Sequence, residues 1–402
     1  MFNHSILPTN QTENQLANLS DRLGVYIHIP YCLQRCTYCD FATYVHTEIL
    51  DSAKYTELVK KEIQMNKNLF APQYLQTIYF GGGTPSLIPA DHLKDIIKTL
   101  EHFGYKTDQQ TEITIEINPA TVDEQKLNHY LEMGVNRFSV GAQTFSDRLL
   151  KMVNREHNSQ QTFETLKLLR KYNLNYSFDL LFALPTQTLK ELKYDLDLAS
   201  DLGMKHLSPY CLTVPEGHPL SKNRPLDTEQ LDMFQLIDDF LVAKNFYQYE
   251  ISNYSLPGCE SKHNLLYWTD KSYWGLGLSA HSYSKKSDWG TRFWNPSNIN
   301  LYEKMIKEGT FVFDENSSET LLFHQSLTDF CHTSLRLKNG LSKKLILNKF
   351  GPGALAKIEV LSLKLIDQGL VQFSNDCYSL TRKGIYISNQ IFEVFTFLKS
   401  DF

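Results

Sequence analysis

The spacing of apolar and polar residues divides the first half of the chain into alternating strand and helix patterns. Short runs rich in β-branched and aromatic residues predict strands, and longer runs with apolar residues at helical spacing predict helices. The predicted strands are residues 25–29, 77–80, 111–117, 137–140, 176–182 and 206–212, and examples of the intervening helical patterns are 52–69, 123–134 and 159–173. Six strand–helix units in a row predict an α/β fold with a parallel sheet, as a barrel or a partial (β/α)6 barrel.

Five of these strands are followed at once by a polar or glycine-rich run. The runs are PYCLQRC (30–36), GGGTP (81–85), NPAT (118–121), GAQTF (141–145) and ALPTQT (183–188). In a barrel, the carboxyl ends of the strands gather at one rim, and active sites lie there. A doubly wound sheet is the alternative, but it should carry a G-x-G-x-x-G loop near its start, and the sequence contains none there.

The pattern changes after residue 212. Residues 213–315 are aromatic and irregular, and we expect an added α+β region of loops and short strands against the barrel. Residues 316–402 are mostly helical and end in a helix, a turn and a small hairpin at 358–384, which predicts a winged-helix-like C-terminal domain. Residues 1–22 are polar and predict a flexible leader. The barrel is therefore expected at 23–212.

Composition and charge exclude several classes of protein. The 402 residues are 42% hydrophobic, which is enough for a large core, and the net charge of -5 provides no basic field to attract nucleic acid or anionic lipid. No apolar run reaches membrane-spanning length. Four of the seven cysteines are scattered singly, which argues against a disulfide scaffold. We expect a cytoplasmic protein with no integral membrane segment and no nucleic-acid partner.

Three cysteines, Cys32, Cys36 and Cys39, lie within eight residues directly after the first predicted strand. Thiolates bind soft metals and hold iron–sulfur clusters. A [4Fe–4S] cluster has four irons, so three cysteines leave one iron open to a small molecule. The alternatives are a partial zinc site completed by a distant His or Cys, or three unrelated thiols. We favour the cluster because the loop follows a strand and the other rim motifs agree with it.

The C-x3-C-x2-C spacing resembles that of the radical S-adenosylmethionine (SAM) superfamily. The motifs YIHIPYC, GGGTPS, EINP, GAQTF and HNLLYW, in this order, are similar to those of one branch, the coproporphyrinogen III oxidase-like family. The resemblance runs from about Tyr26 to the C-terminal domain. It implies a [4Fe–4S] cluster on the three cysteines, SAM bound at the open iron, and one-electron cleavage of SAM to methionine and a 5′-deoxyadenosyl radical.

The resemblance also implies a set of SAM contacts. Glycines let the backbone approach a ligand and expose N–H groups to a carboxylate, arginine pairs with a carboxylate, and Gln and Asp bond ribose hydroxyls. Taken singly, each of these residues is more often a structural or solvated polar group. The implied contacts are Tyr26, Tyr38, Gly82, Gly83, Thr84, Glu116, Gln143, Arg155 and Asp179.

Two groups within that family compete. The oxygen-independent coproporphyrinogen III oxidases, which decarboxylate two propionates in heme synthesis, carry a further cysteine where this sequence has Phe41. The HemW-type heme chaperones carry CDF there and an HN-x-x-YW motif, and this sequence has both. The resemblance is therefore greater to the chaperones, which bind heme and are thought to hand it to acceptor proteins. Whether such a protein also works as an enzyme that cleaves SAM is left open.

The HN-x-x-YW motif supplies candidate heme contacts. His263 is a candidate ligand of the heme iron, with Tyr267 and Trp268 packing on the porphyrin, and His281 and Cys259 are further candidate ligands. A histidine bonded to the backbone is the alternative for His263. The implied partners are heme, heme-acceptor proteins and an electron donor such as a flavodoxin or ferredoxin.

The winged-helix-like end also admits a function of another class, an iron–sulfur-sensing nucleic-acid regulator. Residues 341–402 contain 8 Lys/Arg against 5 Asp/Glu, which is too slight a surplus for a phosphate-binding surface. We therefore interpret this domain as a lid or a partner surface.

Overall fold

The computed structural model describes residues 22–309 and 317–402, so all but the last residue of the predicted leader lies outside the described residues. All six predicted strands are present. They are β1 (Gly24–Ile29), β4 (Thr77–Gly82), β5 (Glu112–Ile117), β6 (Arg137–Gln143), β7 (Asn175–Phe182) and β8 (His206–Cys211). Each pairs in parallel with the next, which confirms the predicted α/β fold with a parallel sheet.

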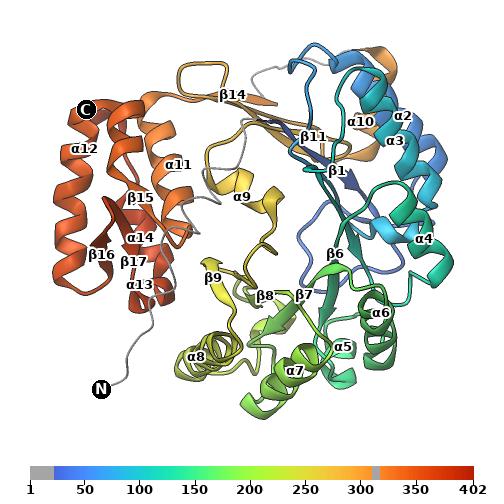
Figure 1. Ribbon diagram of the computed structural model, residues 1–402, viewed down its shortest axis with the longest axis horizontal. Coiled ribbons are helices and arrows are strands. Elements are labelled where there is room, and N and C mark those ends of the chain that lie inside the picture. The colour runs from blue at the N-terminus through green and yellow to red at the C-terminus, as the bar shows by residue number, and fades with distance from the viewer. Residues whose placement is uncertain (1–21, 310–316) are drawn as a thin grey trace.

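Helices cover the outer side of these strands. They are α2 (Ser52–Asn66), α3 (Ala90–His102), α4 (Glu124–Glu132), α5 (Asp147–Met152), α6 (Ser159–Lys171) and α7 (Leu189–Asp201). Several begin at a side chain that accepts a hydrogen bond from the first turn, as Asp51 does for α2 and Thr188 for α7. Figure 1 shows the strands as an arc with these helices along its outer edge.

The sheet extends beyond the parallel strands at both ends. β11 (Tyr273–Leu276) pairs in parallel with β1, and β12 (His281–Ser284), β13 (Thr291–Trp294) and β14 (Ser318–Thr320) follow it in antiparallel pairs. Beyond β8 lie β10 (Asn253–Ser255) and β9 (Tyr247–Glu250). Within the described residues, β14 and β9 are the two edges of one open sheet.

The region after residue 212 is more helical than its sequence suggested. The short strands β9–β13 and the helices α8 (Asp227–Ala243), α9 (Lys262–Trp268) and α10 (Ile299–Glu308) fit an α+β region, although the sequence analysis specified only its loops and short strands. In α8 the buried residues Met233, Ile237 and Leu241 recur every four positions, which is a helical spacing that was visible in the sequence. The HNLLYW motif forms α9, whose first turn is capped by the Ser261 side chain.

The C-terminal residues form a second apolar core, separate from the core of the large sheet. We call these residues, 323–402, the C-terminal unit. They contain α11 (Phe323–Arg336), β15 (Leu341–Ser342), α12 (Lys343–Asp367), β16 (Val371–Ser374), β17 (Cys377–Leu380), α13 (Arg382–Tyr386) and α14 (Ser388–Val394). The order β15-β17-β16, with α12 leading into the hairpin, agrees with the winged-helix-like pattern. Figure 1 shows this unit beside the arc, with α9 between the two.

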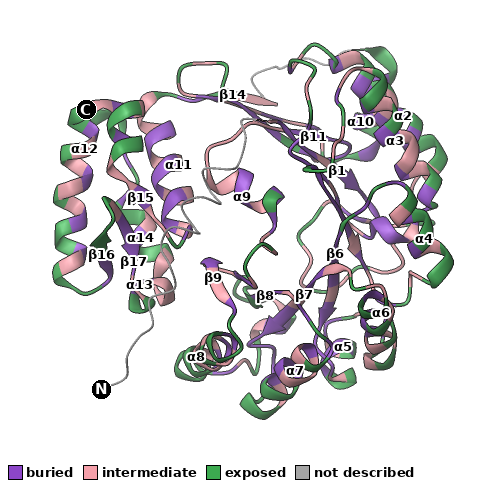
Figure 2. Cartoon of the chain, in the orientation of Figure 1, coloured by how far each residue is buried: buried purple, intermediate pink, exposed green. Residues whose placement is uncertain are grey.

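Burial follows this architecture. Figure 2 shows buried residues along the strands and on the helix sides that face them, with exposed residues on the outer helix surfaces. No helix within 22–309 or 317–402 is long and apolar enough to span a lipid bilayer.

Two glycines with nearly the same backbone conformation offer a test of the junction that precedes β15. Gly340 and Gly309 have φ of 70° and 69°. A Cβ atom on Gly340 would lie 2.0 Å from the backbone oxygen of Tyr378 in β17, whereas a Cβ on Gly309 would meet nothing within 4 Å. Of these two glycines, Gly340 alone combines the left-handed conformation with a close backbone approach.

We predict that Gly340→Ala lowers the free energy of unfolding by about 3 kcal/mol or more, because the backbone strain and the overlap with Tyr378 add. Gly309→Ala should cost only about 1–2 kcal/mol, the strain alone. Urea unfolding followed by circular dichroism measures both values. Equal losses in the two variants would contradict the close packing of this junction.

Candidate functional site

The inner face of the parallel strands is lined with polar side chains. Strands of a parallel sheet covered on both faces usually read as continuous apolar runs, but here alternate positions on each strand are polar. The apolar set packs against the helices in the main core. The polar set, which we call the lumen, comprises Thr77, Tyr79, Glu112, Thr114, Glu116, Arg137, Ser139, Ser177, Asp179, His206 and Ser208. Several of these side chains bond to one another across strands, as in the Ser139–Asp179 and Ser177–Ser139 pairs.

The three predicted cluster cysteines lie at the carboxyl rim, in the loop that follows β1. The short strand β2 (Tyr31–Cys32) pairs with β3 (Tyr44–Val45) and closes this loop. The loop is also held by the segment after α5, where Asn154 Nδ2 donates to the Arg35 oxygen at 2.7 Å and Gln34 Nε2 donates to the Asn154 oxygen at 3.1 Å. The positions of the cysteines are thus fixed by contacts within the loop after β1 and by the segment after α5, which follows β6.

Each of the three thiols has a polar side chain beside it. Thr84 Oγ1 lies 3.9 Å from the Cys32 sulfur, and Thr43 Oγ1 lies 4.0 Å from the Cys39 sulfur. Arg155 Nη1 lies 3.4 Å from the Cys36 sulfur. Burial raises the pKa of Cys32, the hydrogen bond from Thr84 partly offsets this rise, and the charges of the other two thiols add to it.

The arrangement fits a cluster better than a single ion. All three cysteines are free and partly exposed. In the described ranges, no three His, Cys, Asp or Glu side chains converge closely enough to hold one metal ion. A cubane cluster does not require convergence on a point, because each thiolate binds a different iron.

The glycine loop packs directly against the segment that leads to the cysteines. Gly82 has φ of 112°, and a Cβ atom there would lie 2.6 Å from the His28 ring. A Cβ atom on Gly83 would lie 2.6 Å from the Tyr31 oxygen. Any larger residue would therefore displace the start of the cysteine loop.

The N–H groups of this loop are used within the protein. Gly82 donates to Glu116 Oε2 at 3.0 Å, Gly83 donates to the Ile29 oxygen, and Thr84 donates to the Tyr31 oxygen. The contact of Gly82, Gly83 and Thr84 with SAM remains a prediction, but these N–H groups already have hydrogen-bond partners within the protein. The reason is the parallel β1–β4 register, which carries the strand pairing on into the loop.

Two carboxylates share the upper part of the lumen. Glu116 accepts a hydrogen bond from Tyr79 at 2.9 Å, and burial, aided by the charge of Asp179, raises its pKa to about 7. Asp179 accepts a hydrogen bond from Ser139 at 3.1 Å, and burial raises its pKa. The protonation of Glu116 therefore changes near neutral pH.

The side chains of Gln143 and Arg155 meet at Gly141, near the carboxyl end of β6. A Cβ atom on Gly141 would lie 3.0 Å from Arg155 Nη2 and 3.2 Å from Gln143 Nε2. Arg155 also donates to the Gly141 oxygen. Tyr38 packs on an apolar cluster with Val153, and burial raises its pKa. The rim thus brings most of the predicted SAM contacts close to the cysteines.

Tyr26 lies deeper, inside the barrel. Its ring stacks on Tyr79 with centroids 6.1 Å apart, and its hydroxyl lies 3.0 Å from His28 Nδ1. Tyr79 in turn stacks on His263 at 5.0 Å. These rings form a column that joins the rim to the other end of the lumen.

The α9 helix closes the amino end of the lumen. The backbone N–H groups of Lys262 and His263 both donate to the Glu112 carboxylate at 3.1 Å. Glu112 and Thr77 are the first residues of their strands. At Gly24, the start of β1, a Cβ atom would lie 2.2 Å from the Leu266 side chain, so α9 packs tightly against this end.

Both ring nitrogens of His263 are occupied. Nδ1 lies 2.6 Å from Thr77 Oγ1, and Nε2 lies 2.8 Å from the Tyr267 hydroxyl. The side chain is 1% exposed, and burial lowers its pKa to about 3, so the imidazole is neutral. In this arrangement His263 cannot reach an external ligand unless α9 moves.

The other candidate heme contacts are dispersed. Trp268 lies under the Arg336 guanidinium at 4.4 Å from the ring centroid. His281 lies instead on β12, exposed and stacked on Trp294 at 5.7 Å. Cys259 is half-buried just before α9, and burial raises the pKa of its thiol. Tyr267 and Trp268 thus lie beside each other on α9, with ring centroids 6.4 Å apart, whereas His281 lies on a different element.

Several buried polar residues of the parallel strands were missed by the sequence reasoning. His28 is buried, bonds to the Ala42 oxygen at 2.9 Å, and has a pKa lowered to about 4 by burial. His206 lies 2.7 Å from the Tyr249 hydroxyl. Arg137 is 2% exposed, and its charge helps to lower the pKa of His206 and His263. Polar residues at alternate positions in six buried strands were the signal that could have found them.

Comparisons with known proteins agree with this geometry. The model of the radical SAM superfamily matches residues 26–199, and that of the HemN C-terminal domain matches residues 327–387. The heme chaperone HemW of Bacillus subtilis is 32% identical over 92% of this chain and 98% of its own. That of Synechocystis is 36% identical over 79% of each chain.

A solved structure shares the fold. Coproporphyrinogen III oxidase (HemN) from Escherichia coli superposes with a TM-score of 0.79, at 22% identity, over 95% of this chain and 92% of that chain. At this identity the likeness concerns the fold alone. The sequence matches, over nearly the whole length of the relative from Bacillus subtilis, show that the chain belongs to the radical SAM superfamily and, within it, to the family of the heme chaperone HemW.

Proposed function

We propose that this protein is a cytoplasmic heme chaperone that carries a [4Fe–4S] cluster and SAM at the carboxyl rim of its lumen. It binds heme at α9 and passes it to acceptor proteins. The observation that carries the proposal is the pairing of two features in one chain. Phe41, 65% exposed, follows the cysteine loop where the oxidases have a further cysteine, and the HN-x-x-YW motif forms a complete helix at the opposite end.

The rim residues suit the proposed cofactors. Cys32, Cys36 and Cys39 would hold three irons, and the cluster with SAM would supply one-electron chemistry when reduced by a flavodoxin- or ferredoxin-like donor. Arg155 and Thr84 stand beside the sulfurs and stabilise thiolate charge. The remaining lumen groups at the rim offer polar contacts to a bound SAM. These are Glu116, Gln143 and Asp179.

The α9 residues suit a carrier that must release its cargo. The neutral imidazole of His263 is the form that binds iron, and Tyr267 and Trp268 offer aromatic cover for an apolar ring. One imidazole ligand is easier to exchange than a two-ligand clamp. Because His263 is buried and bonded to Thr77 and Tyr267, heme binding includes an opening of α9.

The cluster ligands can be tested by iron content. Anaerobically reconstituted protein should hold about four irons per chain, as a cubane cluster requires. Cys36→Ser should lose the cluster, because a thiolate ligand is removed, whereas Cys211→Ser should retain it, since Cys211 lies exposed at the end of β8. Full iron content in Cys36→Ser would refute the assignment.

The SAM contacts can be tested by binding. Asp179→Ala and Arg155→Ala should each weaken SAM binding by about 1.5–3 kcal/mol, the worth of a charged hydrogen bond. SAM titration of the reduced cluster, followed by electron paramagnetic resonance, measures the affinity. Asp197→Ala, which removes an exposed carboxylate on α7, is the control and should bind like the wild type. Unchanged affinity in both test variants would show that these residues do not contact SAM.

The heme ligand can be tested by spectroscopy. His263→Ala should shift or weaken the Soret band of bound hemin and leave the iron–sulfur absorbance intact, because the two sites lie at opposite ends of the lumen. His281→Ala, which changes an exposed histidine on β12, should leave the Soret band unchanged. If His281→Ala changed the Soret band and His263→Ala did not, the heme ligand would instead be His281 on β12.

The oxidase alternative makes an opposite prediction for activity. If the protein, with SAM and a reductant, converted coproporphyrinogen III to protoporphyrinogen IX over many turnovers, the oxidase function would replace the chaperone function. We expect no turnover.

A further inference from the structure

Arg336, the last residue of α11, fastens the C-terminal unit over α9. Its guanidinium stacks on the Trp268 ring at 4.4 Å, and its Nη2 donates to the Glu250 carboxylate at 3.1 Å. Around it, the Ile251 N–H donates to the Arg336 oxygen, and the Lys338 N–H donates to the Tyr249 oxygen. One side chain thus joins the HN-x-x-YW helix, the edge strand β9 and the C-terminal unit.

Arg336 and Trp268 do not use all of their hydrogen-bond donors at this contact. Arg336 Nε and Trp268 Nε1 are both buried, and neither has a hydrogen-bond partner among residues 22–309 and 317–402. Glu250, in contrast, also accepts from the Ser252 N–H at 3.0 Å and from the Asn253 side chain. When Arg336 leaves, Glu250 Oε1 keeps these two hydrogen bonds but the buried Oε2 loses the guanidinium, so a new pair between Arg336 and a ligand has to offset this cost.

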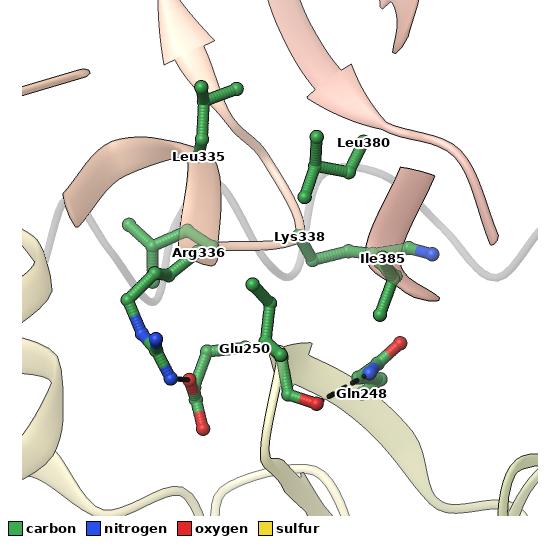
Figure 3. Close-up of a pocket in the computed structure, with 9 residues that line it drawn as sticks. Gln248, Glu250, Leu335, Arg336, Lys338, Leu380 and Ile385 are labelled. Carbon is green, nitrogen blue, oxygen red and sulfur yellow. Dashed lines mark hydrogen bonds and ion pairs between the residues drawn. The ribbon is translucent and has the colours of Figure 1, made fainter. Parts of the chain in front are cut away.

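A cleft opens at this junction (Figure 3). Figure 3 shows Arg336 reaching down to Glu250 while Lys338 extends along the other side. The apolar wall is formed by Ile251, Leu335, Leu337, Leu380 and Ile385. Lys338 is exposed, and within the described part of the chain its ammonium group forms no ion pair. The cleft therefore presents two cations, one of them paired with Glu250, beside an apolar wall.

The size of the cleft limits what it can hold when closed. Its enclosed volume is about 10 Å³, close to the least that one water molecule needs. Pockets for small organic molecules usually measure roughly 300–1,000 Å³. The closed cleft therefore admits neither a carboxylate arm nor a ring, and both require the C-terminal unit to swing away from α9.

We propose that this cleft is the docking site for the carboxylate arms of a tetrapyrrole, and that Arg336 is its latch. A ligand carboxylate replaces Glu250 as the partner of Arg336, and the guanidinium leaves the Trp268 ring. The freed indole and α9 then become accessible to the macrocycle. Heme matches this chemistry because it combines an apolar ring with two carboxylates, and arginine pairs with carboxylates in a fork. The inference rests on the proposed heme binding. It adds the place where the heme carboxylates dock and the residue that controls access to α9.

The experiment compares hemin with hemin dimethyl ester, which has the same ring and no free carboxylate. Wild-type protein should bind hemin about tenfold or more tightly than the ester, since a charge-assisted pair with Arg336 is formed only by hemin. In Arg336→Met, which keeps an apolar stem and removes the charge, this preference should fall to within about twofold. The ester should bind Arg336→Met more tightly than the wild type, because no latch has to open.

Two further variants separate the latch from a structural role. Arg292→Met removes the ion pair between β13 and Asp329, which also joins α11 to the large sheet, and it should keep the wild-type preference for hemin. Arg336→Lys retains the charge and should recover most of the preference. Uniform weakening of both ligands in Arg336→Met would mean that Arg336 only supports the fold.

The outcomes distinguish this inference from the function on which it rests. Equal affinity of the wild type for hemin and its ester would overturn the latch while leaving heme binding in place. Absence of binding of either compound to the wild type would overturn the proposed function and the latch together.

Discussion

The polar inner face of the parallel sheet has to be satisfied inside the protein, and the rest of the structure depends on how this is done. At the carboxyl rim, Glu116 bonds to Tyr79 and to the glycine loop, which sets that loop against the cysteine segment. At the amino end, Glu112 accepts the first N–H groups of α9, and Thr77 bonds to His263. A sheet with an apolar inner face would position neither end in this way.

The two proposed binding sites lie at opposite ends of the lumen. The cysteine loop and the SAM contacts lie at one end, and the HN-x-x-YW helix lies at the other, with the stacked rings of Tyr26, Tyr79 and His263 between them. The C-terminal unit contacts the second end through Arg336. In the proposed function, this unit controls access to α9, and the separation of the two ends keeps the cofactor site apart from the cargo.

The sequence predicted the sheet and the rim well because both depend on local patterns. The six strands have strong period-2 and β-branched signals, and the motifs after them fall at a common rim by topology alone. The lumen was not predicted, because the polar residues of each strand have meaning only when neighbouring strands place them together, as for Arg137 beside His206. The burial of His263 could not be predicted from the sequence either, because it depends on contacts with Thr77 and Tyr267. Only Tyr267 is near His263 in the sequence. The role of Arg336 required the contact between two units far apart in the chain.

Amide hydrogen exchange on addition of hemin tests the central claim, that heme is bound at the amino end of the lumen, most directly. The account predicts that exchange changes in residues 262–268 and 335–338, because α9 and the latch rearrange, while residues 32–39 and 81–84 at the rim keep their rates. Protection of the rim segments, with no change in α9 or around Arg336, would contradict it.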